Sequence, residues 1–444
     1  MSRIPHDEKV RRVADAVAEA ARQGRQVHPA KKSVSHMVPL PDDPRSRTMP
    51  VDLSDLDEIL AIDPVARTAT AEPGVSFGRL VDETLKHGLI PTVVPELDGI
   101  TIGGAVAGCS VESMSYKYGG FHDSAIEYEI VDGTGKVRVV SAGQDPHVFD
   151  MIHGSYGTLS LLTRLTFRLV PAKPYVRVTY VTLPTAEAFH AEMLARCRAA
   201  DHDFVDGIIH GPSKFVLCLG DFVDRAPYVS DYTWLNVFYK STATRNEDYL
   251  TTRGYCFRYD AECHWMTRTF PPMEWKPVRF LVGKWFLGST NVLKSARRFE
   301  PIFKRTRLRP DLVVDVFIPV RNFRPFVQWY RETFDYWPLW IVPYKVPRMY
   351  PWLSDDWQKR IEDEYAIDCA VYGKSDNDPK VHLSEMLQHK THELGGMKTL
   401  ISRNHYTEDE FWTVYSKDRY EAAKSDLDPS GVFPHLFRKF GRVG

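Results

Sequence analysis

The sequence of 444 residues has few cysteines, and the six that are present are scattered along the chain without a CxxC pair. This pattern disfavours a disulfide scaffold and a zinc site, and it favours a reducing, cytoplasmic compartment. The sequence also lacks any run of about 18 apolar residues, so no membrane-spanning helix is expected. Its first residues, MSRIPHDEKVRR, lack the apolar core of a signal peptide.

An excess of charge of either sign is also absent, because 57 basic residues balance 58 acidic ones. A near-neutral chain has no overall attraction to nucleic acid, and no basic stripe with interleaved stacking residues is present. The sequence contains no G-x-S-x-G elbow of a serine hydrolase. A length of 444 residues is enough for two or three folded domains, and a hydrophobic content of 43% is enough for each to bury a core.

Apolar periodicity predicts both helices and strands along the chain. Residues 7–23 have helical spacing and end at Gly24, and Ser76 is placed to cap a second helix. A hairpin is expected around residues 132–135, followed by a strand at 159–170. Further strands are expected at 176–182, 204–210, 214–222, 313–320, 339–346 and 367–372, with helices at 185–200, 323–334 and 381–394. This order predicts an α+β fold.

The segment 95–113, PELDGITIGGAVAGCSVES, is the most informative part of the sequence. Gly103, Gly104 and Gly108 allow the backbone to approach a ligand closely and to point N–H groups at an anion. The spacing is not G-x-G-x-x-G, which disfavours a nicotinamide Rossmann site. Together with a second small-residue cluster, GSYGTL at 154–159, the segment is compatible with a packed turn or with a phosphate- or flavin-lined cleft.

Several short motifs then follow in a fixed order: P-E-L-D at 95–98, T-x-G-G at 101–104, K-Y-G at 117–119, S-x-G-T-L at 155–159 and P-A-K-x-Y at 171–175. In this order they resemble the delta-24 sterol reductase family of the vanillyl-alcohol-oxidase-type FAD-binding superfamily. Weaker similarity extends through 336–343 to the C-terminal region, so the resemblance covers most of the chain. It implies an FAD-binding domain at 1–172, a cap domain with an antiparallel sheet at 173–400, and a tail at 401–444 that returns to the FAD domain.

The resemblance also implies which residues contact the cofactor. They are Thr101, Ile102, Gly103, Gly104, Ala105, Gly108, Cys109, Ser110, Glu112, Ser113, His122, Gly157, Thr158 and Leu159. No histidine or cysteine stands in an obvious covalent-flavin motif, so non-covalent FAD is expected. The chain departs from the wider superfamily because no glycine occurs between Gly24 and Gly74, where a glycine-rich pyrophosphate loop usually lies. Lys31, Lys32 and Ser33 could neutralise the phosphate instead, or they could simply lie in a solvated loop.

Reduction of an isolated C=C bond needs a hydride donor and an acid on the opposite carbon. Tyr406, His405 and His122 are the candidate acids, although each is also a plausible packing residue. Cys256 and Cys263 are too poorly spaced for a metal site, and no metal is expected.

The favoured function is therefore an FAD-dependent reductase of a C=C bond in a sterol, isoprenoid or other apolar lipid, with NADPH or NADH as reductant. Three alternatives remain: a methylene-fatty-acyl reductase of the same fold, a flavin-dependent oxidase, and a flavin- or lipid-binding protein without turnover. The aromatic residues crowded in 329–352 fit an apolar ligand. A patch of Phe280, Leu281, Trp285 and Phe286 beside basic residues indicates a peripheral membrane contact. No nucleic-acid partner is expected, and the oligomeric state stays open.

Overall fold

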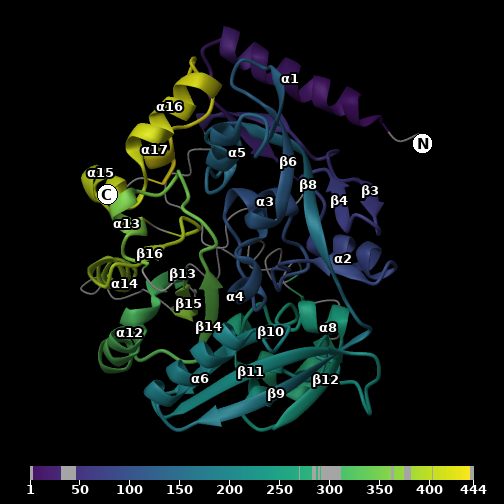
Figure 1. Cartoon of the computed structure of the whole chain (residues 1–444), viewed down its shortest axis with the longest axis vertical. Coiled ribbons are helices and arrows are strands. Elements are labelled where there is room, and N and C mark those ends of the chain that lie inside the picture. The colour runs from purple at the N-terminus through teal and green to yellow at the C-terminus, as the bar shows by residue number, and fades with distance from the viewer. Residues whose placement is uncertain are drawn as a thin grey trace.

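The computed structural model describes residues 4–31, 47–269, 271–282, 287–288, 291, 312–361, 365–374, 382–402 and 404–440 (Figure 1). Two antiparallel sheets organise this part of the chain, together with helices on their faces. The chain completes the first sheet before it enters the second, between residues 171 and 175. The α+β class expected from the sequence is confirmed. Lys32, Ser33, Trp285 and Phe286 lie outside the described residues.

The first sheet has the strand order β3-β4-β8-β6-β7, and β5 pairs with β8 beside this path. Its strands are β3 (Ile59–Asp63), β4 (Thr68–Ala71), β5 (Leu89–Pro91), β6 (Ala125–Val131), β7 (Val137–Ser141) and β8 (Leu161–Pro171). The expected hairpin joins β6 to β7, and its turn is held by Asp132. The Oδ1 atom of Asp132 accepts the backbone N–H groups of Thr134 at 2.9 Å and Lys136 at 3.1 Å.

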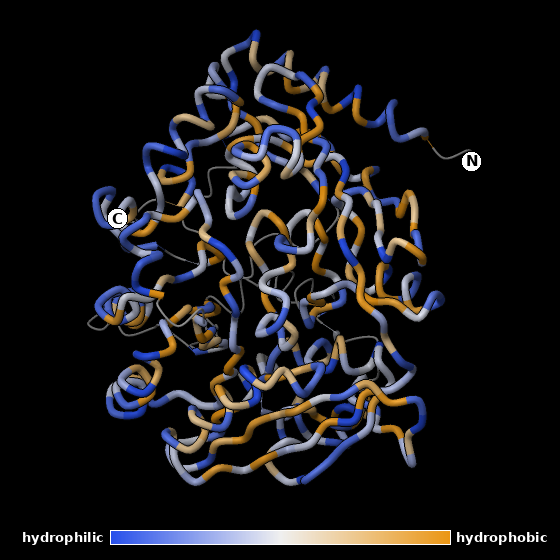
Figure 2. The backbone as a smooth tube through the Cα atoms, in the orientation of Figure 1, coloured by the Kyte–Doolittle hydropathy of each residue, from blue (hydrophilic) through white to orange (hydrophobic). Residues whose placement is uncertain are grey.

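Helices surround this sheet, and the sequence gives their start points and buried faces. Helix α1 (His6–Arg22) buries Val10, Val13 and Val17, and Figure 2 shows hydrophilic and hydrophobic residues alternating along it. Ser76 caps α2 (Phe77–Leu85) as expected, because its Oγ accepts the N–H of Arg79 at 3.3 Å. The other elements here are α3 (Ile102–Ala107), α4 (Ser115–Tyr118), α5 (Pro146–Ile152) and the parallel pair β1 (Val27–Ala30) and β2 (Met49–Asp52).

The second sheet has eight strands in the order β12-β9-β11-β10-β14-β15-β13-β16. They are β9 (Tyr175–Leu183), β10 (Phe204–Gly211), β11 (Lys214–Val223), β12 (Glu247–Thr251), β13 (Leu312–Pro319), β14 (Leu339–Lys345), β15 (Tyr365–Lys374) and β16 (Met397–Lys398). One face packs against α6 (Ala186–Ala199), α12 (Phe323–Trp329) and α14 (Leu383–Glu393) in a single apolar cluster. The helix expected at 323–334 changes at residue 330 into a π-helical turn, Tyr330–Phe334.

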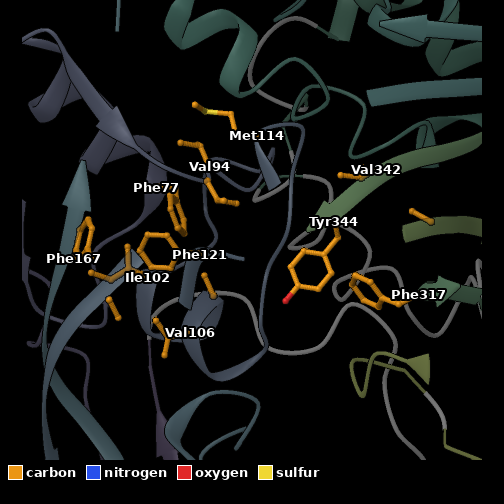
Figure 3. Packing of buried hydrophobic residues seen from close by; sticks show 14 of the residues in the cluster. Phe77, Val94, Ile102, Val106, Met114, Phe121, Phe167, Phe317, Val342 and Tyr344 are labelled. Atoms are coloured by element: carbon orange, nitrogen blue, oxygen red, sulfur yellow. The ribbon is translucent and has the colours of Figure 1, made fainter. Parts of the chain in front are cut away.

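The opposite face of the second sheet is turned toward the first part of the molecule. Side chains alternate along each strand, so Val314 and Val316 of β13 join the cluster under α6, whereas Val313 and Phe317 join the cluster shared with the first sheet. Figure 3 shows this shared packing, with Phe317 beside Tyr344 on the second-sheet side. The second sheet is therefore covered on both faces.

The C-terminal segment packs against the first sheet region. Its helices are α15 (Glu408–Val414), α16 (Lys417–Leu427) and α17 (Leu436–Phe440), and Figure 1 shows α16 beside α5. Lys424 Nζ donates to the carbonyl oxygen of Thr158 at 2.7 Å, and the N–H of Val27 donates to the carbonyl of Val432 at 2.8 Å. Further α-helices of the described residues are α7 (Phe238–Thr242), α8 (Thr252–Cys256), α9 (Lys276–Val282) and α13 (Asp355–Gln358). In the part of the chain that the structure describes, no helix combines the length and the apolar character needed to cross a membrane.

Candidate functional site

A cavity of about 440 Å³ lies between the glycine-rich segment and the second sheet. Its size falls within the range of small-molecule and cofactor sites. One wall comes from the loop and helix around α3, and the opposite wall comes from β13, β14 and β15. The C-terminal helix α17 closes part of the rim with Lys439 and Phe440. Segments far apart in the sequence, with Val27 and Lys31 near β1 among their residues, thus form one site.

The first wall is made largely of bare backbone. A Cβ on Gly103 would lie 2.5 Å from Cβ of Pro73, and one on Gly108 would lie 3.1 Å from the carbonyl oxygen of Gly104. Gly157 has a φ of +68°, which side chains rarely tolerate, and a Cβ there would meet nothing within 4 Å. Glycine at 103 and 108 therefore lets α3 pack closely on its neighbours, and the open space at Gly157 leaves the main chain accessible from the cavity. The wall fits the FAD implied by the resemblance.

The predicted cofactor residues divide into two groups. Seven of the predicted residues line the cavity: Thr101, Gly103, Gly104, Gly108, Cys109, Ser110 and Gly157. The others lie behind the wall. Ile102 points away from the cavity into the apolar cluster with Phe77 and Phe121, as Figure 3 shows. Ala105, Glu112, Ser113, Thr158 and Leu159 are likewise buried and do not line the cavity.

None of the three predicted acids lines the cavity. The ring of His122 is buried between His153, at 5.1 Å, and Tyr350, at 5.3 Å, and burial lowers its pKa. His405 shares a hydrogen bond of 2.8 Å with Ser384 on α14. Tyr406 is buried beside His392, at 5.5 Å between ring centres. His405 and Tyr406 occupy packed positions because the C-terminal segment meets α14 before it reaches α17.

Instead, acidic and aromatic side chains of the second sheet form the wall that faces the glycines. Asp315 of β13, Trp340 of β14, and Asp368 and Tyr372 of β15 all line the cavity. The Tyr372 hydroxyl donates to Asp315, and Trp340 Nε1 donates to Asp206 at 2.7 Å. These residues were not predicted from the sequence. Their signal was an aspartate at the centre of an apolar strand, in LVVDVFIP and in YAIDCAVYGK.

His264 and Glu96 complete this wall from outside the sheet. Nε2 of His264 is bonded to the Glu96 carboxylate, and its ring lies 4.6 Å from that of Tyr372. Cys263, His264 and Trp265 all have positive φ values, between 45° and 50°. A left-handed conformation costs a non-glycine residue about 1–2 kcal/mol. The contacts of His264 and Trp265 with the cavity wall must therefore hold this turn in place.

Burial controls the protonation of the carboxyl groups around the cavity. It raises the pKa of Asp315 to about 6. It also raises the pKa of Asp368 well above its ordinary value, and the charges of Asp315 and Glu96 act in the same direction. Burial acts to raise the pKa of Glu96 as well, but His264 outweighs it and the pKa falls below its ordinary value. The wall therefore combines a Glu96 carboxyl whose pKa is lowered with an Asp368 carboxyl whose pKa is raised.

A buried ion cluster connects the two walls. Arg258 donates through Nη2 to Glu112 at 2.6 Å and to Asp206 at 3.1 Å, and all three side chains are almost fully buried. Glu112 lies near the end of the glycine-rich segment 95–113, whereas Asp206 lies on β10 and also accepts the Trp340 indole N–H. The cluster thus fixes the position of the glycine wall relative to the aromatic wall.

Glu262, next to the turn that carries His264, gives a testable pH dependence. Burial raises its pKa to about 8 from an ordinary 4.5. Between these values the folded state keeps a proton that the unfolded state releases, so stability falls as the pH rises. We expect Glu262→Gln to remove this slope, which is at most about 1.4 kcal/mol per pH unit. Thermal melts from pH 5 to pH 8 should show the wild type losing Tm relative to the variant. A difference in Tm between wild type and variant that stays constant from pH 5 to pH 8 would contradict the prediction.

Comparison with known proteins agrees with this geometry. Residues 6–141 match the family described as FAD binding domain. The chain is 25% identical to the Delta(24)-sterol reductase of Homo sapiens over 86% of this chain and 76% of that protein. It is 24% identical to the Delta(24)-sterol reductase of Arabidopsis thaliana over 98% of this chain and 84% of that protein, and 25% identical to that of Pisum sativum over 99% and 82%. The resemblance found in the sequence is confirmed, and FAD is supported as the cofactor.

Proposed function

We propose that this protein is an FAD-dependent oxidoreductase that reduces a C=C bond in a sterol or a related apolar lipid. One observation carries the proposal: a cavity in which a glycine-rich wall faces an aromatic wall that carries the buried carboxyl group of Asp368. The match to FAD binding domains supports the cofactor, and the names of the relatives support the reaction. NADPH or NADH is proposed as the electron source.

The residues that hold the cofactor are those of the glycine wall. Backbone groups of Thr101, Gly103, Gly104 and Gly157 face the cavity and suit a non-covalent cofactor. When FAD is bound, it supplies the hydride for one carbon of the double bond. The chain itself must orient the alkene, exclude water and supply a proton to the other carbon.

Apolar residues are placed to bind the body of a lipid substrate. A second, smaller cavity of about 40 Å³ shares Gly108, Cys109 and Phe317 with the main one. Its other walls are mostly aromatic and include Tyr344, Tyr350, Trp352, Trp357 and Tyr415. At about 40 Å³ this cavity is too small for a lipid skeleton, whose sites measure roughly 300–1,000 Å³, so we propose that it only extends the apolar end of the main cavity. The two cavities together give the site a polar end and an apolar end.

The proposal is tested by spectroscopy of the purified protein. Flavin absorbance that acid precipitation releases into solution is expected for non-covalent FAD. Anaerobic NADPH should bleach the flavin, and a Δ24-unsaturated sterol should restore its colour. Restoration only by a methylene-fatty-acyl lipid would assign the branched-lipid reaction instead, and restoration only by oxygen would assign an oxidase. A protein that binds no flavin after incubation with FAD would overturn the proposal in favour of a binding protein.

Lys439 gives a prediction for cofactor binding. It lines the cavity from α17, and its Nζ donates to the carbonyl oxygen of Tyr156 at 2.5 Å. We propose that it also neutralises the FAD diphosphate. Lys439→Ala should weaken FAD binding about tenfold, which corresponds to about 1.4 kcal/mol, and the loss should shrink at high salt. Flavin fluorescence titration measures the effect. The exposed neighbour Arg438 is the matched control, and an equal loss in Arg438→Ala would contradict the assignment.

We also propose a peripheral membrane contact through the region of α9. Trp275, Phe280 and Leu281 are 60%, 62% and 82% exposed, an unusual grouping of large apolar side chains. Such side chains insert into the interface of a bilayer. The protein should sediment with anionic phospholipid vesicles, and replacement of all three residues by serine should abolish sedimentation. Equal sedimentation of wild type and variant would place the contact elsewhere.

A further inference from the structure

Asp368 occupies an unusual position for a carboxyl group. It lies at the centre of β15, between Ile367 and Cys369, whose side chains point into the apolar cluster under α6, α12 and α14. Asp368 points to the other face, where it lines the main cavity and is only 2% exposed. An unpaired buried carboxylate is costly, so a position of this kind favours the neutral acid.

The neighbours of Asp368 on the sheet offer it no opposite charge. Phe317 of β13 and Val342 of β14 lie directly beside it in the strand register. Asp315 lies diagonally across, but Asp315 already accepts the Tyr372 hydroxyl. The Oδ1 atom of Asp368 has no hydrogen-bond partner among the described residues. A proton on Oδ1 of Asp368 would thus not be held in a hydrogen bond to a neighbouring side chain.

We propose that Asp368 is the proton donor for the C=C reduction, an inference that rests on the proposed function. The O–H bond of its carboxyl group breaks as a C–H bond forms at the alkene carbon that does not receive the hydride. The π electrons of the alkene form this new bond, and the hydride electrons come from the flavin, which the nicotinamide reductant replenishes. Asp368 is left as a carboxylate and regains its proton from solvent.

Other acids in the cavity are engaged in side-chain contacts that Asp368 lacks. The Tyr372 hydroxyl donates to Asp315, and His264 is bonded through Nε2 to Glu96. Burial, and after it the nearby charges of Asp315 and Glu96, raises the pKa of Asp368 well above its ordinary value, and this favours its reprotonation after each turnover. His264, whose Nδ1 atom also lacks a partner among the described residues, is the competing donor.

Reduction of the flavin by NADPH and its reoxidation by the alkene can be measured separately in the holoenzyme. Only the second step needs a proton donor. In Asp368→Asn and Asp368→Leu, flavin reduction by NADPH should stay within about twofold of the wild type. Flavin reoxidation by the Δ24-unsaturated sterol should slow by about 10²–10⁴-fold. The leucine variant places no polar group in the buried position, so the test can still be made if the asparagine variant does not fold. Cys369→Ala, next to Asp368 on the opposite face, is the control and should reoxidise at the wild-type rate.

Infrared difference spectroscopy provides a readout that does not depend on turnover. At pH 7 the wild type minus Asp368→Asn spectrum should contain the C=O stretch of a protonated carboxyl group. Absence of this band would overturn the inference, and so would wild-type reoxidation rates in both Asp368 variants. A selective loss in His264→Asn, with Asp368→Asn unaffected, would reassign the donor to His264. A wild type that reduces no alkene would instead refute the proposed function itself.

Discussion

Replacement of Arg258 by methionine is expected to lower the free energy of unfolding by about 3–5 kcal/mol. The guanidinium group is fully enclosed and donates to Glu112 and Asp206, which are also buried. The variant would leave two carboxyl groups without their cation in the protein interior. Burial already raises the pKa of Glu112 to about 7 although Arg258 opposes this. Denaturant unfolding of wild type and variant measures the difference.

Arg253 is a matched control for this prediction. It belongs to α8, close to Arg258 in the chain, and pairs with Asp82 and Asp98, but it is 42% exposed. Exposed ion pairs contribute about 0–1 kcal/mol, so Arg253→Met should change stability little. The triple change Glu112→Gln, Asp206→Asn and Arg258→Met should recover part of the loss, because no charge remains buried. A loss below about 1 kcal/mol in Arg258→Met would contradict the interpretation.

Gly103→Ala should raise the FAD dissociation constant by about 10–100-fold. The added Cβ would lie 2.5 Å from Cβ of Pro73 and 3.1 Å from its carbonyl oxygen, so α3 must move. Overpacking of this kind costs about 1–3 kcal/mol. Since α3 forms the cavity wall, the shift displaces the backbone groups that face the cofactor. Flavin fluorescence titration measures binding, and thermal melts separate it from a loss of fold.

Gly143→Ala is the matched control for this change. Gly143 has no atom within 4 Å of the added Cβ and does not adopt a positive φ. The variant should bind FAD as the wild type does. Unchanged FAD binding in Gly103→Ala would show that the cofactor does not depend on this wall, and the assignment of the site would then fail.

Local signals allowed much of the fold to be predicted. Helix α1, the Ser76 cap of α2 and the β6–β7 hairpin all depend on residues a few positions apart in the chain, and the structure contains each of them. The π-helical turn at Tyr330–Phe334 was not predicted, because it replaces a regular helical turn without a change in the apolar pattern. The glycine segment was also found, because close backbone approach requires glycine at particular positions.

The sequence by itself therefore determined many of the elements, the α+β class and the glycine segment of the site. The tertiary structure alone decided what faces that wall. Asp315, Trp340 and Asp368 meet because β13, β14 and β15 pair in one register, and a shift of one residue would turn every side chain to the other face. His264 reaches Glu96 across 168 residues of sequence. Such long-range juxtapositions depend on how the sheets pair and pack, which no local pattern specifies.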